Sequence, residues 1–81
     1  MTEKEREKKE RPKFQKRFGE HLKKIRMSKG LTMSEFARRC FMESSNMARI
    51  EAGRINPSLF VLKKLAVALE ISLEELLKGF D

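Results

Sequence analysis

Cysteine and histidine each occur once in this chain, and tryptophan and tyrosine are absent. A single cysteine cannot form an internal disulfide, and one cysteine with one histidine is too few for the usual zinc sites. No run approaches the roughly 18 apolar residues of a membrane-spanning helix. The charged N-terminus also lacks the apolar segment of a signal peptide. We therefore expect no metal or other cofactor, no membrane partner and a cytoplasmic location.

The residue combinations that support catalysis are missing as well. The sequence contains no recognisable nucleophile and base pair, no metal-ligand set and no phosphate-binding loop, so we expect neither an enzyme nor a small-molecule substrate. A chain of 81 residues has room for one small domain. Such a domain buries about 60% of its unfolded surface, which suits a compact helical core and leaves no room for a large enclosed pocket.

Charge is plentiful and unevenly distributed. Charged residues make up 38% of the chain, and the formal net charge is +7. Residues 14–64 carry 12 Lys or Arg against four Glu, a net charge of +8, whereas residues 65–81 carry a net charge of −3. This balance favours a polyanionic partner, and the acidic C-terminal end should face away from it.

Residues 1–13 form a segment of different composition. The segment has no apolar residue after Met1 and carries six basic and four acidic residues. We expect a charged, disordered N-terminal arm that Pro12 separates from a folded domain at residues 14–81. The alternative is an arm that follows a phosphate backbone or a minor groove.

Apolar residues in residues 14–81 recur at helical spacing and predict several helices. The first should run from about Phe14 to Ser28 and end before Gly30. Ser58 should cap a later helix, and Ser72 with Glu75 should form a capping box for a final helix that ends near Lys78. The expected core positions of these three helices are Phe14, Phe18, Leu22, Ile25, Leu59, Leu62, Leu65, Ala66, Leu69, Leu73, Leu76 and Leu77.

Two short helices joined by a tight turn are predicted between Leu31 and Gly53. Thr32 and Glu35 form a capping box at the start of the first helix, whose inner face carries Phe36, Ala37 and Cys40. At about 100° per residue, Met47, Ile50 and Glu51 of the second helix point one way. Its other face carries Ser44, Ser45, Ala48 and Arg49. This layout is typical of a helix-turn-helix that reads DNA.

The sequences GLTMSEFA and NMARIEAGRINPSLFVLKKLAVALEIS strengthen that interpretation. From about Phe18 to Leu77 the chain resembles the Cro and phage-repressor type of helix-turn-helix, the XRE-like family. The resemblance implies an all-α fold, a compact five-helix bundle of the lambda-repressor-like type. It also implies a bacterial or phage transcriptional regulator, by expectation a repressor, that binds double-stranded DNA as a homodimer on an inverted repeat.

The resemblance also assigns roles to individual residues. Ser44, Ser45 and Arg49 would contact base edges, although the amides of the two serines could instead anchor a phosphate. Arg54 would contact the DNA backbone, and Asn56 either does so or serves only as a turn residue. A structural pair is implied between Arg26 and Glu51. The full set that we expect at the DNA is Met33, Arg38, Ser44, Ser45, Asn46, Arg49, Arg54 and Asn56.

Three positions depart from the family pattern. Met33 replaces a glutamine that contacts a phosphate, and Glu43 replaces a capping serine or threonine. Phe41 replaces a turn glycine, and because phenylalanine is poorly suited to positive φ we expect the turn to take a different path. Met33 and Glu43 favour an alternative function, in which the same fold is a protein-interaction module or antitoxin that binds DNA weakly.

Three further residues carry expectations of their own. Cys40 should be a small buried residue of the first helix of the pair, and His21 an ordinary surface residue. Phe80 has no evident place in the core of a single subunit, so we expect it to contact a second subunit.

Overall fold

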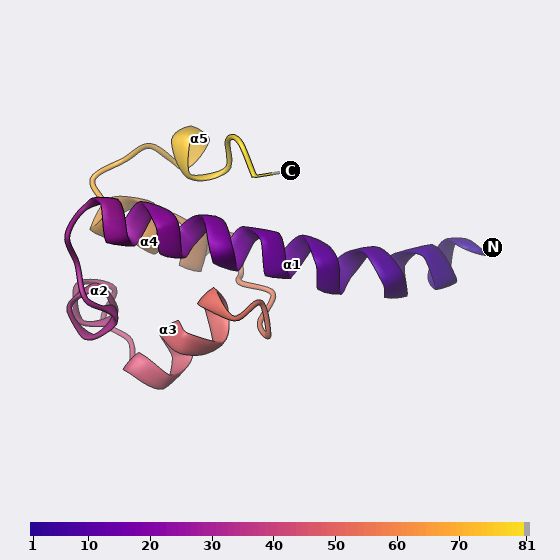
Figure 1. Ribbon diagram of the computed structural model, residues 1–81, viewed down its shortest axis with the longest axis horizontal. Helices are drawn as coiled ribbons and strands as arrows, with labels where there is room; N and C mark the ends of the chain where they lie inside the picture. The colour runs from indigo at the N-terminus through magenta and orange to yellow at the C-terminus, as the bar shows by residue number, and fades with distance from the viewer. Residues whose placement is uncertain (81) are drawn as a thin grey trace.

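The computed structural model describes residues 1–80, and Figure 1 shows their arrangement. Five helices are present in this range, and no strand is, which confirms the predicted all-α class. They are α1 (Glu3–Ser28), α2 (Met33–Arg39), α3 (Ser44–Glu51), α4 (Leu59–Ala68) and α5 (Leu73–Leu76). Helix α1 runs through the middle of the view in Figure 1, with α3 on one side of it and α5 on the other.

Helix α1 begins at Glu3, so the prediction of a start near Phe14 and of a break at Pro12 is wrong. Pro12 lies inside the helix, where it removes a single N–H donor. The carbonyl that loses this donor belongs to an exposed segment, in which water can replace the hydrogen bond. Thr2 caps the helix with Glu5 in a capping box. Residues 1–13 are all exposed, and their role as a distinct arm stays a prediction.

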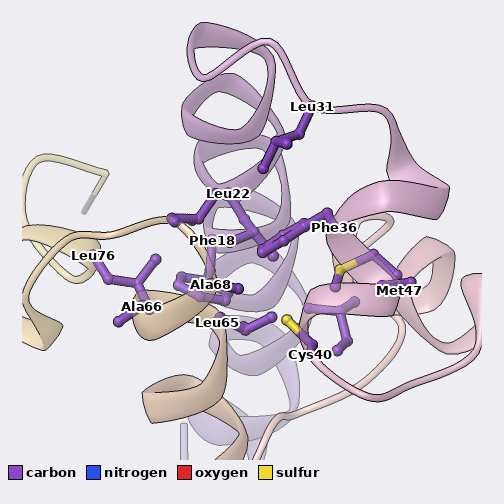
Figure 2. Packing of buried hydrophobic residues seen from close by; sticks show 13 residues of the cluster. Phe18, Leu22, Leu31, Phe36, Cys40, Met47, Leu65, Ala66, Ala68 and Leu76 are labelled. Carbon is purple, nitrogen blue, oxygen red and sulfur yellow. The ribbon is translucent and has the colours of Figure 1, made fainter.

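The core lies where α1 meets the other helices (Figure 2). Its largest fully buried side chains come from every helix and from the residue that follows α2 or α4. Each leucine, phenylalanine or methionine side chain of this set contributes about 1.5–3 kcal/mol relative to exposure. These side chains are Leu22, Phe36, Cys40, Met47, Leu65, Leu69 and Leu76.

The predicted helix starts are confirmed by side-chain caps. Thr32 with Glu35 and Ser72 with Glu75 form complete capping boxes, and Ser58 accepts a hydrogen bond from the amide of Val61. Hydrogen bonds from the backbone N–H and the hydroxyl of Thr32 lower the pKa of Glu35 below its ordinary value.

Helix α2 ends in a Schellman motif, in which Phe41, the residue after the C-cap Cys40, adopts the left-handed conformation. The amide of Phe41 donates to the Arg38 carbonyl, and the amide of Met42 donates to the Ala37 carbonyl. Phe41 has φ 55°, so the expectation of a different turn path is wrong. The left-handed backbone costs a non-glycine residue about 1–2 kcal/mol. Because the Phe41 side chain is 91% exposed, it clashes with nothing, and the two hydrogen bonds hold the turn.

The C-terminal residues fold back onto α1, and this corrects two predictions. The Phe80 ring packs against Phe14, Phe18 and His21, with ring centroids 5.2–5.4 Å apart. His21 is half-buried, and its Nε2 lies 2.9 Å from the carbonyl oxygen of Leu76, to which it donates. Phe80 is therefore partly buried and packs against the core within one subunit, and His21 makes a structural contact, so it is not an ordinary surface residue.

Helices α4 and α5 differ in part from the predicted stripes. Leu65, Ala66 and Leu69 are buried, whereas Leu59 is 71% exposed and does not join the core. Helix α5 ends at Leu76, so it is shorter than predicted, and Leu77 is exposed.

Cys40 is buried, as predicted. Burial raises the pKa of its thiol from an ordinary value of 9.0 to about 11. Among residues 1–80, no helix combines the length and apolarity that a membrane crossing requires.

Candidate nucleic-acid interface

Helix α3 has one packed face and one open face. Met47, Ile50 and Glu51 are buried against the rest of the protein, whereas Ser45 and Arg49 are exposed. Glu43 precedes the helix in extended geometry, and its side chain makes no capping hydrogen bond. The first-turn amides of α3 are therefore not covered by a side-chain cap.

An ion pair between Arg26 and Glu51 anchors the buried side of α3 to α1. Arg26 Nε donates to Glu51 Oε2 over 2.7 Å and Nη2 donates to Oε1 over 3.3 Å, both within the protein interior. The same guanidinium donates through Nη1 to the Leu31 carbonyl over 2.7 Å. The predicted pair is thus confirmed, and together with the Leu31 contact it joins α1, the loop before α2 and the end of α3.

Gly19 sets the distance between α1 and α3, a role that we did not predict. A β-carbon at this position would lie 2.7 Å from the Ile50 carbonyl oxygen and closer still to that of Glu51. No real β-carbon makes contacts so short, so only glycine lets the two backbones approach this closely. The isolated glycine within a helical apolar pattern was the available signal.

The exposed face of α3 carries contacts of its own. Arg49 Nη1 donates to Asn46 Oδ1 over 3.3 Å, which steadies the guanidinium on the helix surface. Ser44 Oγ donates to Ser34 Oγ over 3.4 Å, so the start of α3 is tied to α2. Ser34 is a second residue that we did not single out from the sequence.

The predicted DNA-contacting residues fall into two groups. Arg38, Ser44, Asn46 and Asn56 line one open groove, which is formed by the end of α2, the start of α3 and the loop before α4. The remaining four do not line this groove. Ser45 and Arg49 lie on the exposed face of α3, Arg54 is exposed in the following loop, and Met33 is half-buried at the start of α2.

The groove is mixed in character. Besides polar residues it contains Phe41, Met42, Ile55 and Pro57, together with the carboxylate of Glu43. A negative charge repels phosphate, whereas Arg38 and Lys64 at the same groove attract it. The groove therefore carries two cationic side chains against one carboxylate, and the adjoining exposed face of α3 adds the cation of Arg49.

Comparison with known proteins identifies the fold family. Residues 17–78 match the family model described as a helix-turn-helix domain. The chain is 39% identical over 62 residues to the SPbeta prophage-derived HTH-type transcriptional regulator YonR of Bacillus subtilis. That alignment covers 76% of this chain and 57% of YonR, so the chain spans little more than half of that relative.

Two controller proteins are also similar. The control protein C.MunI of a Mycoplasma species is 36% identical over 66 residues, which cover 80% of this chain and 89% of that protein. The crystal structure of the restriction-modification controller protein C.AhdI from Aeromonas hydrophila superposes with a TM-score of 0.73 at 36% identity. This superposition covers 75% of this chain and 92% of that one.

The match covers most of the chain and includes the α2–α3 pair and the helices that pack behind it. Its relatives are regulators, in agreement with the expectation that the chain is not an enzyme. The chain therefore belongs to the helix-turn-helix family, in the Cro and phage-repressor type that its sequence motifs predicted.

Proposed function

We propose that this protein is a transcriptional repressor that inserts α3 into the major groove of duplex DNA. The main support for the proposal is that α3 has one buried face and one exposed face. Met47, Ile50 and Glu51 are buried, whereas Ser45 and Arg49 are exposed to solvent. Family membership supports it, because the helix-turn-helix places its second helix in the major groove.

Arg49 is the residue best suited to read sequence. Its planar guanidinium matches O6 and N7 of guanine, and a bidentate contact of this kind gives about 1–3 kcal/mol of discrimination. Asn46 accepts one hydrogen bond from this group and so restricts its orientation before DNA arrives. Ser44 and Ser45 specify less, because a hydroxyl donates to or accepts from several bases.

Phosphate contacts fix the orientation of the helix on the duplex. Arg54 and Asn56 are exposed in the loop that follows α3, where they would meet the backbone beside the groove. The acidic residues Glu74 and Glu75 belong to α5, which lies on the opposite side of α1 from α3 (Figure 1). The charge distribution therefore favours approach of DNA from the side of α3.

A homodimer on an inverted repeat forms part of the proposal, since one such module reads too few base pairs to find a single site. The outward face of α4 supports a second copy as the occupant. Leu59, Phe60 and Val67 are 71%, 68% and 66% exposed and share this face with the exposed Lys63, and apolar side chains gathered on one exposed helix face mark an interaction surface.

Two measurements test this function. The affinity for random duplex DNA should fall with rising salt, with a slope of about −0.9 in log K against log salt for each phosphate contacted. Selection from a random DNA pool should return a twofold-symmetric site with half-sites about one helical turn, roughly 34 Å, apart. Binding that is absent at low salt would reject the proposal and favour a protein-interaction module. A single unpaired half-site would reject the dimer.

A further inference from the structure

The first part of α1 projects beyond the packed body of the protein. Residues 3–13 are helical and exposed, and Figure 1 shows them extending past the other helices toward the N-terminus. The family match begins at residue 17, so this projection lies outside the matched region. Its side chains are not needed for the core, which leaves their charge pattern to be explained.

The side of α1 that faces α3 is defined by three contacts. Gln15 Nε2 donates to the Gly53 carbonyl over 3.1 Å, Gly19 meets the backbone of Glu51, and Arg26 pairs with the Glu51 carboxylate. The Gln15 contact is the one nearest the projection. It lies at the loop that carries Arg54, on the side from which we propose that DNA approaches.

A basic stripe continues this side of the helix. Lys4, Lys8, Arg11 and Gln15 follow one another at steps of four, three and four residues, so they share one face. Glu3, Glu7, Glu10 and Phe14 are also separated by four, three and four residues, so the acidic side chains share a different face of the helix. That face is the one on which the Phe14 ring packs against Phe80.

The glutamates that flank the stripe are engaged within the helix. Glu7 pairs with Arg11, and Glu5 caps the helix at Thr2. The Glu7–Arg11 pair is solvent-exposed, so its free energy is small and a phosphate could replace the carboxylate.

The dimensions of the stripe fit a phosphate backbone. At 1.5 Å per residue, Lys4 lies about 16 Å along the helix from Gln15, and Lys4 and Arg11 are about 10 Å apart. One DNA strand carries a phosphate about every 3.4 Å of helix axis, so the distance of about 10 Å between Lys4 and Arg11 corresponds to about three phosphates.

We infer that the stripe formed by Lys4, Lys8 and Arg11 is a second DNA-binding element, which contacts the phosphodiester backbone beyond the segment reached by the α3–α4 loop. The inference rests on the proposed function and adds to it a binding site outside the helix-turn-helix. The stripe recognises charge and spacing but not base sequence, so it raises affinity without altering the preferred site.

The chain offers a closely matched control for the test. The variant Lys4→Gln/Lys8→Gln/Arg11→Gln removes two lysines, one arginine and the Arg11–Glu7 pair. The variant Arg6→Gln/Lys9→Gln/Lys13→Gln removes the same residue types and the Arg6–Glu3 pair from the opposite side of the same helix. Net charge therefore changes equally in both.

The experiment measures binding to the selected duplex at several salt concentrations for the full chain and both variants. The stripe variant should lower the salt slope by about 0.9 for each lost phosphate contact, up to about 2.7 in total, while the control keeps the slope of the unchanged protein. Equal changes in both variants, or no change in either, would overturn the inference. Circular dichroism establishes that α1 keeps its helical content, and Lys4→Arg/Lys8→Arg should retain the slope.

The outcomes also separate the two proposals. Should the unchanged protein show no salt-dependent binding to duplex DNA, both proposals fail. Should it bind, and lose its preferred site on Arg49→Ala, while stripe and control variants behave alike, only the stripe is rejected.

Discussion

Arg26 and Glu51, 25 residues apart in the sequence, form a two-point ion pair inside the protein, with their closest atoms 2.7 Å apart. Neither side chain is left with an unsatisfied buried polar atom among the described residues. Because Glu51 is the last residue of α3, the pair fixes the orientation of the helix that we propose reads DNA.

Removing one partner of this pair should be costly. Glu51→Ala leaves the Arg26 charge buried without its carboxylate, which we expect to lower the free energy of unfolding by about 3–5 kcal/mol. DNA affinity should fall as well, because α3 loses its anchor. Chemical denaturation and a binding titration measure the two effects. An unchanged melting temperature would contradict the structural role, and the double variant Arg26→Met/Glu51→Leu should recover part of the lost stability.

Gly19→Ala should destabilise the protein, although the same change in an exposed helix stabilises by about 0.5–1 kcal/mol. The added β-carbon would collide with the backbone of α3, and overpacking of this kind costs about 1–3 kcal/mol. The displaced α3 should also bind DNA more weakly. Gly30→Ala is the control, because its β-carbon meets nothing within 4 Å and only the φ of +72° is strained. Loss of DNA affinity in both variants would argue against a specific α1–α3 contact.

Arg49→Ala should weaken binding to the selected DNA site by about 1–3 kcal/mol more than binding to random duplex. The reason is that a base contact discriminates between sequences, whereas a phosphate contact does not. Competition between the two DNAs gives the ratio directly. An equal loss on both would identify Arg49 as a phosphate contact, and the protein's melting temperature should be unaffected since the side chain is exposed.

Phe41→Gly should stabilise the protein by about 0.5–1 kcal/mol, because the left-handed penalty of about 1–2 kcal/mol is partly offset by the larger conformational entropy that glycine loses on folding. Glycine adopts φ 55° without the penalty of a β-carbon, and the exposed ring contributes little packing that could be lost. Phe41→Ala keeps the β-carbon and should show no gain. A denaturation midpoint that rises equally in both variants would show that the ring, and not the backbone, is responsible.

Cys40 should make stability depend on alkaline pH. Its pKa is raised from 9.0 to about 11 in the folded protein, so the unfolded chain ionises first as pH rises. The contribution is therefore complete below pH 9 and is lost between pH 9 and 11, by up to about 1.4 kcal/mol per pH unit. Cys40→Ala removes this term, so the difference in unfolding free energy between the two proteins should shrink over that range. A constant difference would rule out the linkage.

Features set by neighbours in the sequence were predicted well. Thr32 with Glu35, and Ser72 with Glu75, act over three residues, so their capping boxes could be recognised without knowing the fold. The Arg26–Glu51 pair connects distant segments, and it was accessible only through the resemblance to a known family.

The wrong predictions share two physical causes. The predicted helix start near Phe14 rests on the lack of apolar residues before it, yet Glu, Lys and Arg are good helix formers, and the packed part of α1 provides the nucleus from which the helix extends to Glu3. Phe80 and Leu59 depend on tertiary packing, since an apolar residue near a helix end can face either way. The exposed face of α3 was predicted correctly. The close approach of α3 to α1 at Gly19 joins residues distant in the sequence, so a helical pattern does not reveal it.

The continuity of α1 has a consequence for how this protein tolerates insertions. A rigid helix transmits rotation, and each residue added to it turns everything upstream by about 100°. One extra residue between Pro12 and Gln15 would therefore swing Lys4 and Lys8 away from the loop at Gly53, while seven would return them to nearly the same side, about 10 Å farther out. The number of residues between the projection and the packed part of α1 therefore sets the side on which Lys4 and Lys8 lie as well as their distance from the body. This holds even though no side chain of the projection takes part in the core.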